Sequence, residues 1–152
     1  MSEPIPAVIA DLDGTLVDVS AILHHVEGEG ERDFHAFHAA ARGCPPHPEV
    51  VEAVRAAHAS GHAVLVVTSR EFIWRDDALD WLVEHGVPYT ELLMRIVGDY
   101  RPDHEVKAEL LDLIEADGYA VTEAWEDAPA VIELYRSRGI TVHRTGGEPV
   151  PG

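Results

Sequence analysis

Two aspartates near the N-terminus are the side chains best placed to do chemistry. Asp11 and Asp13 lie on either side of Leu12, at the end of a predicted strand over residues 6–11. Because strand side chains alternate between faces, the two carboxylates should project the same way and converge. Carboxylates at short range repel each other unless a cation or a shared proton lies between them. The pair therefore predicts a hard divalent metal, with magnesium favoured, or one raised pKa.

The next two residues predict a tight turn. Gly14 allows the chain to reverse sharply, because glycine adopts backbone angles that other residues avoid. The hydroxyl of Thr15 can tie that turn together or hold a carboxylate in place. We therefore count Gly14 and Thr15 as candidate substrate-binding residues.

A second polar group, Thr68, Ser69 and Arg70, follows the apolar run that begins at His62. Hydroxyl and backbone N–H groups there can bind phosphate oxygens, and arginine can contact a phosphate through two hydrogen bonds. The alternative is that the three residues cap the helix that follows.

Two further candidates come later in the chain. Lys107 is the sole lysine, and it lies in the first turns of a predicted helix, where its charge can neutralise a transferring phosphoryl group. The alternative is an ordinary surface lysine. Glu126 and Asp127 follow the fourth predicted strand, and their carboxylates can complete a metal site or cap the helix that starts at Pro129.

The elements that must position these residues can be predicted from hydrophobic periodicity. Apolar runs rich in Val, Ile and Leu alternate with segments of helical period, so we expect an α/β fold with a parallel sheet. Strands are predicted near 6–11, 62–68, 89–94, 119–125 and 140–144. Helices are predicted near 33–42, 48–60, 75–85, 103–116 and 128–138, with Asp33 and Asp103 as capping residues and Gly61 and Gly139 as terminators. Ligands of such a sheet bind beyond the carboxyl ends of its strands, where the candidates lie.

In this order, each after its own strand, these groups resemble the four motifs of the haloacid dehalogenase (HAD) superfamily of phosphatases. The resemblance implies a three-layer Rossmann-like fold with five parallel strands and a minimal cap. It implies that Asp11 is the nucleophile and Asp13 the general acid and base. It also implies that Thr68 binds the phosphate, that Lys107 offsets its charge, and that Mg²⁺ is the cofactor. The metal ligands would be Asp11, Asp13, Glu126 and Asp127.

A closer resemblance is to the 3′-phosphatase domains of phage polynucleotide kinases. It is carried by the runs at 66–71, 102–109 and 126–136. By this similarity Arg70 holds the substrate phosphate or nucleotide, and the substrate is a 3′-phosphate on a nucleotide or a polynucleotide end. The chain departs from that family in lacking a kinase motif and in having Glu126 before Asp127, of which we favour Asp127 as the metal ligand.

Composition limits the partners that we expect. The 152 residues are 46% hydrophobic, which fits one compact domain over residues 1–152, with the irregular segment around 17–47 as a small insertion. A net charge of −17 disfavours long duplex DNA, which is bound by clustered Lys and Arg, but it allows one phosphorylated end beside a metal ion. No apolar run is long enough to span a membrane and no secretory signal is visible, so we expect a cytoplasmic protein. The oligomeric state is left open.

Three other interpretations remain at this point. The substrate can be a small metabolite or a 5′-nucleotide. The chain can be a receiver-like or inactive phosphate-binding module, although a receiver has its phosphorylated aspartate after the third strand, where this chain has Met94 and Arg95. Finally, His35 and His38 lie one helical turn apart and can bind a transition metal.

Overall fold

The computed structural model describes residues 3–27 and 32–145. The strands are β1 (Ile5–Ala10), β2 (Ala63–Glu71), β3 (Glu91–Arg95), β4 (Tyr119–Glu126) and β5 (Thr141–Arg144). The helices are α1 (Phe34–Ala41), α2 (Pro48–Ala59), α3 (Arg75–Glu84), α4 (Asp103–Ala116) and α5 (Pro129–Ser137), with two short 3-10 helices, η1 (Ser20–His25) and η2 (Phe72–Trp74). The predicted alternation of strands and helices is confirmed.

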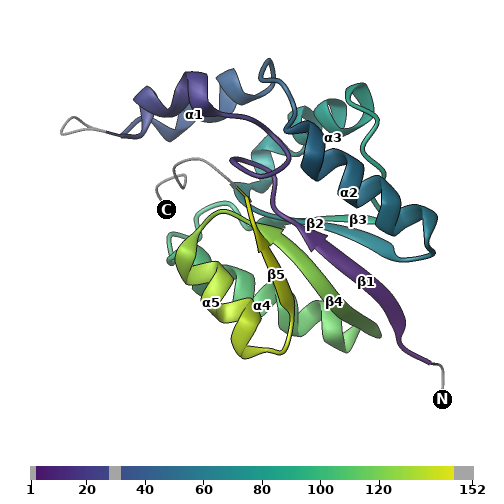
Figure 1. The fold of residues 1–152 in the computed structure, drawn as a ribbon. Helices are drawn as coiled ribbons and strands as arrows, with labels where there is room; N and C mark the ends of the chain where they lie inside the picture. The colour runs from purple at the N-terminus through teal and green to yellow at the C-terminus, as the bar shows by residue number, and fades with distance from the viewer. Residues whose placement is uncertain (1–2, 28–31, 146–152) are drawn as a thin grey trace.

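The five strands form one parallel sheet in the order β3-β2-β1-β4-β5. The last residue of β1, Ala10, pairs with Val66 of β2 and with Trp125 of β4. The carboxyl ends of the three central strands therefore lie side by side (Figure 1). The residues that follow these strands are brought together, as the sequence predicted.

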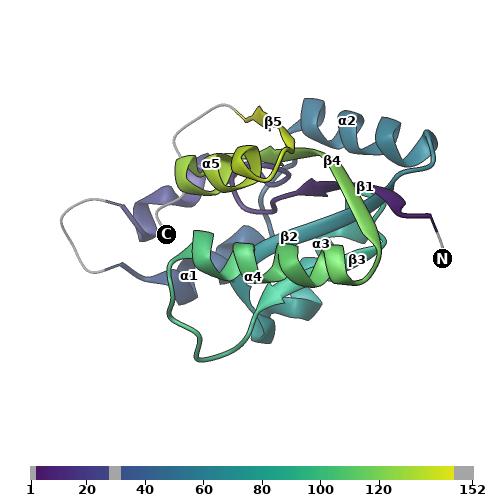
Figure 2. The same ribbon diagram turned by 90° about the horizontal axis from the view of Figure 1, so that it is seen from below.

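Alternating side chains of the central strands bury the two faces of the sheet. Val8 and Ala10 of β1 pack with the core under α2 and α3, whereas Ala7 and Ile9 pack with the core under α4 and α5. Figures 1 and 2 show the two helix pairs on opposite sides of the sheet. The result is the predicted three-layer α/β architecture.

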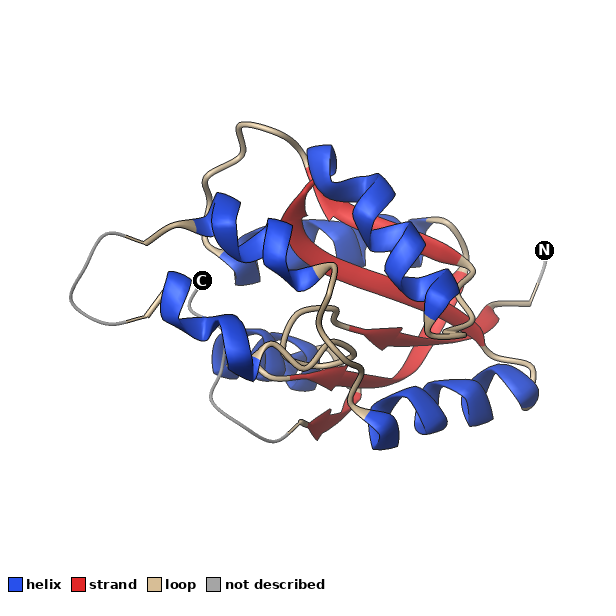
Figure 3. Ribbon diagram, turned by 90° about the horizontal axis from the view of Figure 1, so that it is seen from above, coloured by secondary structure: helices blue, strands red, loops and turns tan. Residues whose placement is uncertain are grey.

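The segment between β1 and α2 lies beyond the carboxyl ends of the strands (Figure 3). Its two ends are joined by a bridge between Val17 and Pro46, and the N–H of His47 donates to the carbonyl of Leu16. Helix α1 is capped by the carboxylate of Asp33, which accepts a hydrogen bond from the N–H of Ala36, as predicted.

Two details of the prediction are wrong. Strand β2 does not end at residue 68 but continues to Glu71, because Glu71 still pairs with Arg95 of β3 after a shift in register. Asp103 does not cap α4, because Pro102 occupies the cap position and the Asp103 carboxylate binds Arg95 instead. Among the described residues, no helix is both long and apolar enough to cross a membrane.

Candidate active site

The turn after β1 fixes the first acidic group. Strand β1 ends at Ala10, so Asp11 and Asp13 lie in the turn rather than in the strand, and strand alternation does not orient them. Gly14 has a φ of 83°, which is open to glycine, and its N–H donates to the carbonyl of Val17. The hydroxyl of Thr15 lies 3.4 Å from Oδ2 of Asp11. The turn thus presents Asp11 and Asp13 from a hydrogen-bonded loop.

Asp11 shares a buried lysine with an acid from another strand. Nζ of Lys107 donates to Oδ1 of Asp11 at 3.0 Å and to Oε2 of Glu126 at 2.8 Å. The side chain of Lys107 is only 2% exposed, so the alternative of a surface lysine is wrong. Burial would lower the pKa of Lys107, but Asp11 and Glu126 outweigh it and keep the lysine charged.

Three buried carboxylates lie close together at this point, and two of them bind the lysine. One oxygen from each of Asp11, Glu126 and Asp127 lies within 4.8 Å of the others. Burial and the charge of Glu126 raise the pKa of Asp11 to about 7, although Lys107 opposes the rise. The site therefore holds more negative charge than one lysine neutralises, and its donors are all carboxylate oxygens. Both features fit a hard divalent cation such as Mg²⁺.

Both carboxylate oxygens of Glu126 accept hydrogen bonds from the protein. Its Oε2 accepts from Lys107, and its Oε1 accepts from the N–H groups of Asp127 and Ala128 at 3.2 Å each. Asp127 has its Oδ1 at 3.5 Å from the hydroxyl of Thr15. Both acids that follow β4 are therefore held by the protein close to Asp11.

The carboxylate of Asp13 is paired with a different cation, Arg70. Nε of Arg70 donates to Oδ2 of Asp13 at 2.8 Å and Nη2 donates to Oδ1 at 2.6 Å, a two-pronged contact in which both side chains are buried. Burial by itself would raise the pKa of Asp13, but Arg70 outweighs it and the pKa is lowered. The Asp13 side chain therefore stands outside the group formed by Asp11, Glu126 and Asp127.

The end of β2 supplies the remaining predicted residues. Thr68 is buried, and its Oγ1 accepts a hydrogen bond from the N–H of Arg70. The carbonyl of Ser69 accepts from Nε of Arg95 at 2.9 Å. Arg95 also donates to Oδ1 of Asp103 at 2.6 Å, which joins the end of β2 to the start of α4, one turn before Lys107.

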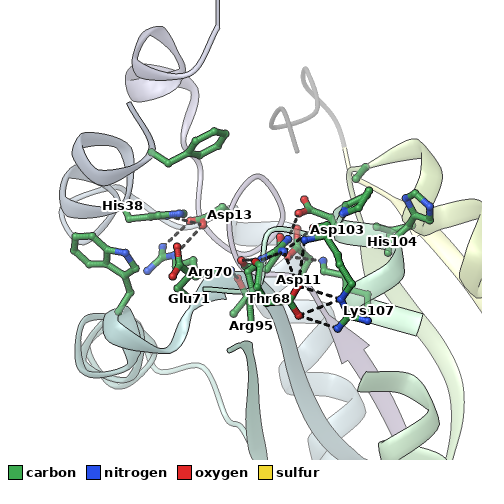
Figure 4. A pocket seen from close by; sticks show the side chains of 18 of the residues that line it. Asp11, Asp13, His38, Thr68, Arg70, Glu71, Arg95, Asp103, His104 and Lys107 are labelled. Atoms are coloured by element: carbon green, nitrogen blue, oxygen red, sulfur yellow. Dashed lines mark hydrogen bonds and ion pairs between the residues drawn. The ribbon is translucent and has the colours of Figure 1, made fainter. Parts of the chain in front are cut away.

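These groups open into one cavity of about 790 Å³. Figure 4 shows Asp13, Arg70 and His38 on one side of it, Lys107 and His104 on the other, and Asp11 and Thr68 between them. The cavity brings together these predicted residues: Asp11, Asp13, Thr68, Ser69, Arg70, Lys107, Glu126 and Asp127. Gly14 and Thr15 do not line the cavity. They belong to the turn that carries Asp11, and the Thr15 hydroxyl contacts the Asp11 carboxylate.

Several lining residues were not predicted to act at the site. His38 of α1 has its Nδ1 3.7 Å from Oδ2 of Asp13, and Trp74 of η2 lies against His38 with ring centroids 5.7 Å apart. Arg95 and Asp103 join the site through the contact described above. The sequence marked His38 only as a possible transition-metal ligand, and its contacts with Asp13 and Trp74 were not predicted, because side chains from α1 and η2 meet only after the chain has folded. The only signal was the unusual number of histidines near residue 38.

The alternative of a transition-metal site on His35 and His38 finds no support in the geometry. Within residues 3–27 and 32–145, the three buried carboxylates are the only group of three or more His, Cys, Asp or Glu residues that is close enough to hold an ion. The two histidine rings instead pack against Trp74.

A family model agrees with this arrangement. The model of the polynucleotide kinase PNKP phosphatase domain matches residues 5–146, which include all five strands and every site residue named above. A search of curated proteins gave no match.

Solved structures place the fold among phosphatases. A chain of a Pnkp1/Rnl/Hen1 complex is 26% identical, with a TM-score of 0.79, and the alignment covers 99% of this chain and 48% of that one. A chain of the Pnkp1/Rnl/Hen1 RNA repair complex is 24% identical, with a TM-score of 0.78, and the coverages are 97% and 45%. This chain therefore spans about half the length of those two. The class C acid phosphatase from Bacillus anthracis with tungstate bound has a TM-score of 0.68 at 14% identity, covering 99% of this chain and 68% of that one, which shows the shared fold.

Proposed function

Because the chain belongs to the family of polynucleotide kinase PNKP phosphatase domains, and is thus a HAD-type phosphatase domain, we propose that it removes 3′-phosphates from polynucleotide ends or nucleotides with the help of Mg²⁺. The observation that carries the proposal is the pair of aspartates in one cavity with different partners. Asp11 lies close to two other carboxylates and pairs with Lys107, whereas Asp13 pairs with Arg70.

In the first step, Asp11 attacks the phosphorus atom of the substrate in line with the leaving oxygen. A bond forms between an Asp11 oxygen and phosphorus, the bond from phosphorus to the leaving oxygen breaks, and that oxygen takes a proton from Asp13. Lys107, whose Nζ lies 3.0 Å from Asp11 in the structure, offsets the charge on the transferring group.

In the second step, water attacks the phosphorus atom of the aspartyl phosphate. Asp13 accepts the proton of the water, the bond between Asp11 and phosphorus breaks, and inorganic phosphate leaves. Asp13 is then protonated and Asp11 free, so the site is ready for another turnover.

Arg70 links substrate binding to the protonation of Asp13. Its Nη1 is buried and makes no hydrogen bond to any described residue, so it is the donor that remains for a phosphate oxygen. An anionic phosphate in the cavity competes with Asp13 for Arg70. This competition weakens the contact that lowers the pKa of Asp13, and Asp13 can then carry the proton that the first step requires.

The metal ligands in this proposal are Asp11 and the two acids that follow β4, Glu126 and Asp127, of which we favour Asp127. The carboxylate of Asp13, which the family resemblance also implied as a ligand, is bound to Arg70 and stands outside this group. When bound, Mg²⁺ supplies positive charge that neutralises the phosphoryl oxygens. Thr68, Ser69 and Arg70 orient the phosphate from the end of β2.

The preference for a 3′-phosphate on a nucleotide or polynucleotide end rests on the family and on the openness of the site. We propose that residues 1–152 form one phosphatase domain in which the insertion around 17–47 is the whole cap. Since so small a cap leaves room for a terminus on a larger molecule, an end of a nucleic acid can reach Asp11. A 5′-nucleotide or a small metabolite is the second candidate.

The proposal is tested by comparing hydrolysis of 3′-phosphorylated oligonucleotides, 3′-mononucleotides and 5′-mononucleotides in the presence of Mg²⁺. We expect the 3′-phosphates to be the better substrates and the Asp11→Asn variant to lose both turnover and the phosphoenzyme. The control is Asp112→Asn, which makes the same change at an exposed position of α4 and should keep full activity. Normal activity in Asp11→Asn, or a preference for sugar phosphates, would contradict the proposal.

A further inference from the structure

The cavity has one wall that the proposed chemistry does not use. Phe34, His35 and His38 of α1 meet Trp74 of η2 there, and we call these four residues the aromatic wall. The ring centroids of His35 and Trp74 lie 5.1 Å apart, those of His38 and Trp74 5.7 Å, and those of Phe34 and His38 6.3 Å. The four rings thus form a continuous surface from two segments that are distant in sequence.

The aromatic wall is accessible from the cavity. His35 is exposed, Phe34 is 37% exposed, and His38 and Trp74 are half-buried. An aromatic surface that remains open in a cavity of about 790 Å³ has the size and the chemistry of a ligand subsite.

The position of the wall identifies what would reach it. His38 Nδ1 lies 3.7 Å from Oδ2 of Asp13, and in the proposed function Asp13 protonates the leaving oxygen. Whatever is attached to that oxygen must therefore lie next to His38 as the bond to phosphorus breaks (Figure 4). The wall faces the leaving group rather than the transferred phosphate.

The lining Lys and Arg side chains offer no second ion pair to the leaving group. Four cationic side chains line the cavity, and each is bound to at least one carboxylate. These are Arg70 with Asp13, Arg95 with Asp103, Arg101 with Asp99 and Glu109, and Lys107 with Asp11 and Glu126. A further phosphate of the substrate would meet no unpaired cation among the described lining residues. Affinity for the leaving group must then come from uncharged contacts.

We propose that the aromatic wall is a base-stacking subsite that holds the nucleoside released from the phosphate. This inference rests on the proposed function, because it takes the leaving group to be a nucleoside whose 3′ oxygen is at Asp13. Stacking on Trp74 and the neighbouring rings accepts any base, because every base has a flat aromatic face.

The test compares two substrates that release the same kind of alcohol. A nucleoside 3′-phosphate and glycerol 2-phosphate both leave a secondary alcohol, but only the first has a base. Replacing the ring in Trp74→Ala should raise KM for the nucleoside 3′-phosphate by about 5- to 150-fold, the range expected when base stacking is removed. The kcat/KM for glycerol 2-phosphate should change by less than about 2-fold, because its leaving group has no base to stack on Trp74. Trp74→Phe should retain most of the discrimination, because it keeps a ring.

Phe72→Ala is the matched control. Phe72 belongs to the same 3-10 helix and is 54% exposed, but it does not line the cavity. It should leave both substrates unchanged. If Trp74→Ala affects the two substrates equally, or if Phe72→Ala has the same effect as Trp74→Ala, the inference is overturned while the phosphatase function stands.

A binding measurement separates the inference from the proposed function. Trp81 and Trp125 are buried, so Trp74 is the tryptophan open to the cavity. Added deoxyguanosine, which has no phosphate, should quench the tryptophan fluorescence of the protein, and Trp74→Phe should lose that quenching. If no nucleotide is hydrolysed, the proposed function fails but quenching still supports the subsite. If quenching is the same in Trp74→Phe, the subsite fails whatever the enzyme hydrolyses.

Discussion

Asp11 and Asp13 are separated by one residue, yet their surroundings push their pKa values in opposite directions. Burial and Glu126 raise the pKa of Asp11, whereas Arg70 lowers that of Asp13. Two acids with opposite shifts in one cavity can take separate roles in a reaction. The excess of negative charge is at Asp11, where a divalent cation fits, and the fixed ion pair is at Asp13.

The raised pKa of Asp11 predicts how the metal-free protein responds to pH. Because the folded protein binds the Asp11 proton more tightly than the unfolded chain, this group makes stability fall as pH rises from about 4 to about 7. In a chelator at pH 8, Asp11→Asn should therefore be more stable than the wild type, by on the order of 1–2 kcal/mol or about 2–8 °C in Tm. At pH 5 the gain should shrink. Thermal melts at both pH values check this, and a variant that is less stable at pH 8 would contradict it. Excess Mg²⁺ should reduce or reverse the difference.

The two-pronged contact between Arg70 and Asp13 predicts that lysine cannot replace this arginine. Lysine keeps the charge but offers neither the planar fork nor the unpaired Nη1, so Arg70→Lys should lower kcat/KM on the order of 10- to 100-fold. The control is Arg138→Lys, since Arg138 pairs with Asp112 and Glu115 at the surface and should tolerate the change. Steady-state kinetics of both variants, with melts to show that they are folded, decide the outcome. Equal activity of the two variants would rule out a geometric role for Arg70.

At the scale of elements, the site is made by joining strand ends. Arg95 at the end of β3 donates to the carbonyls of Ser69, Asp99 and Arg101 as well as to the carboxylate of Asp103. One guanidinium thus ties the end of β2 to the loop that leads into α4, and α4 carries Lys107. Among the described residues, no other side chain donates as many hydrogen bonds between these segments.

Arg95→Lys should loosen that loop and displace Lys107 from Asp11. The three backbone carbonyls lose donors that a lysine cannot replace together, so stability should fall by about 1–3 kcal/mol and kcat by more than tenfold. Hydrogen exchange should rise in residues 96–102 while that of β1 stays unchanged. Arg101→Lys, which alters an exposed ion pair in the same loop, is the control. Unchanged exchange in the loop would show that Arg95 does not hold it.

The sequence predicted the elements well because periodicity and terminators are local signals. Gly61 and Gly139 follow α2 and α5 with positive φ angles, and Pro129 begins α5, as predicted. The prediction was wrong at Asp103, because the pairing of its carboxylate with Arg95 is a contact between elements that no local pattern encodes.

The site residues that belong to sequence motifs could be predicted. Asp11, Thr68 and Lys107 lie near or after the carboxyl ends of strands of one parallel sheet, so their meeting depends only on fold class. The partners of each acid could not be predicted, because they depend on which cation reaches which carboxylate. The contacts of His38 with Asp13 and Trp74 could not be predicted for the same reason, since α1 and η2 meet only through the tertiary fold.

At the scale of the whole molecule, the protein and its proposed substrate both carry negative charge. The chain has a net charge of −17, and seven carboxylates but only four Lys and Arg side chains line the cavity. In the proposed function, a polynucleotide end therefore approaches against a repulsive field, and only its transferred phosphate meets cations. Most nucleic-acid-binding proteins behave in the opposite way, because their Lys and Arg clusters release counterions from the backbone.

This opposition of charge predicts an unusual salt dependence. Added salt screens repulsion over distances of about 8–10 Å, so raising NaCl from about 50 to 200 mM at constant Mg²⁺ should lower or leave unchanged the KM for a 3′-phosphorylated oligonucleotide. A protein that binds the backbone through several phosphates would show KM rising by orders of magnitude over the same range. The effect should grow with oligonucleotide length, because each added phosphate adds repulsion, and a 3′-mononucleotide should respond least. A steep rise of KM with salt would instead reveal a cationic path to the site that lies outside the lining residues, and it would contradict the view that stacking and the single phosphate carry the affinity.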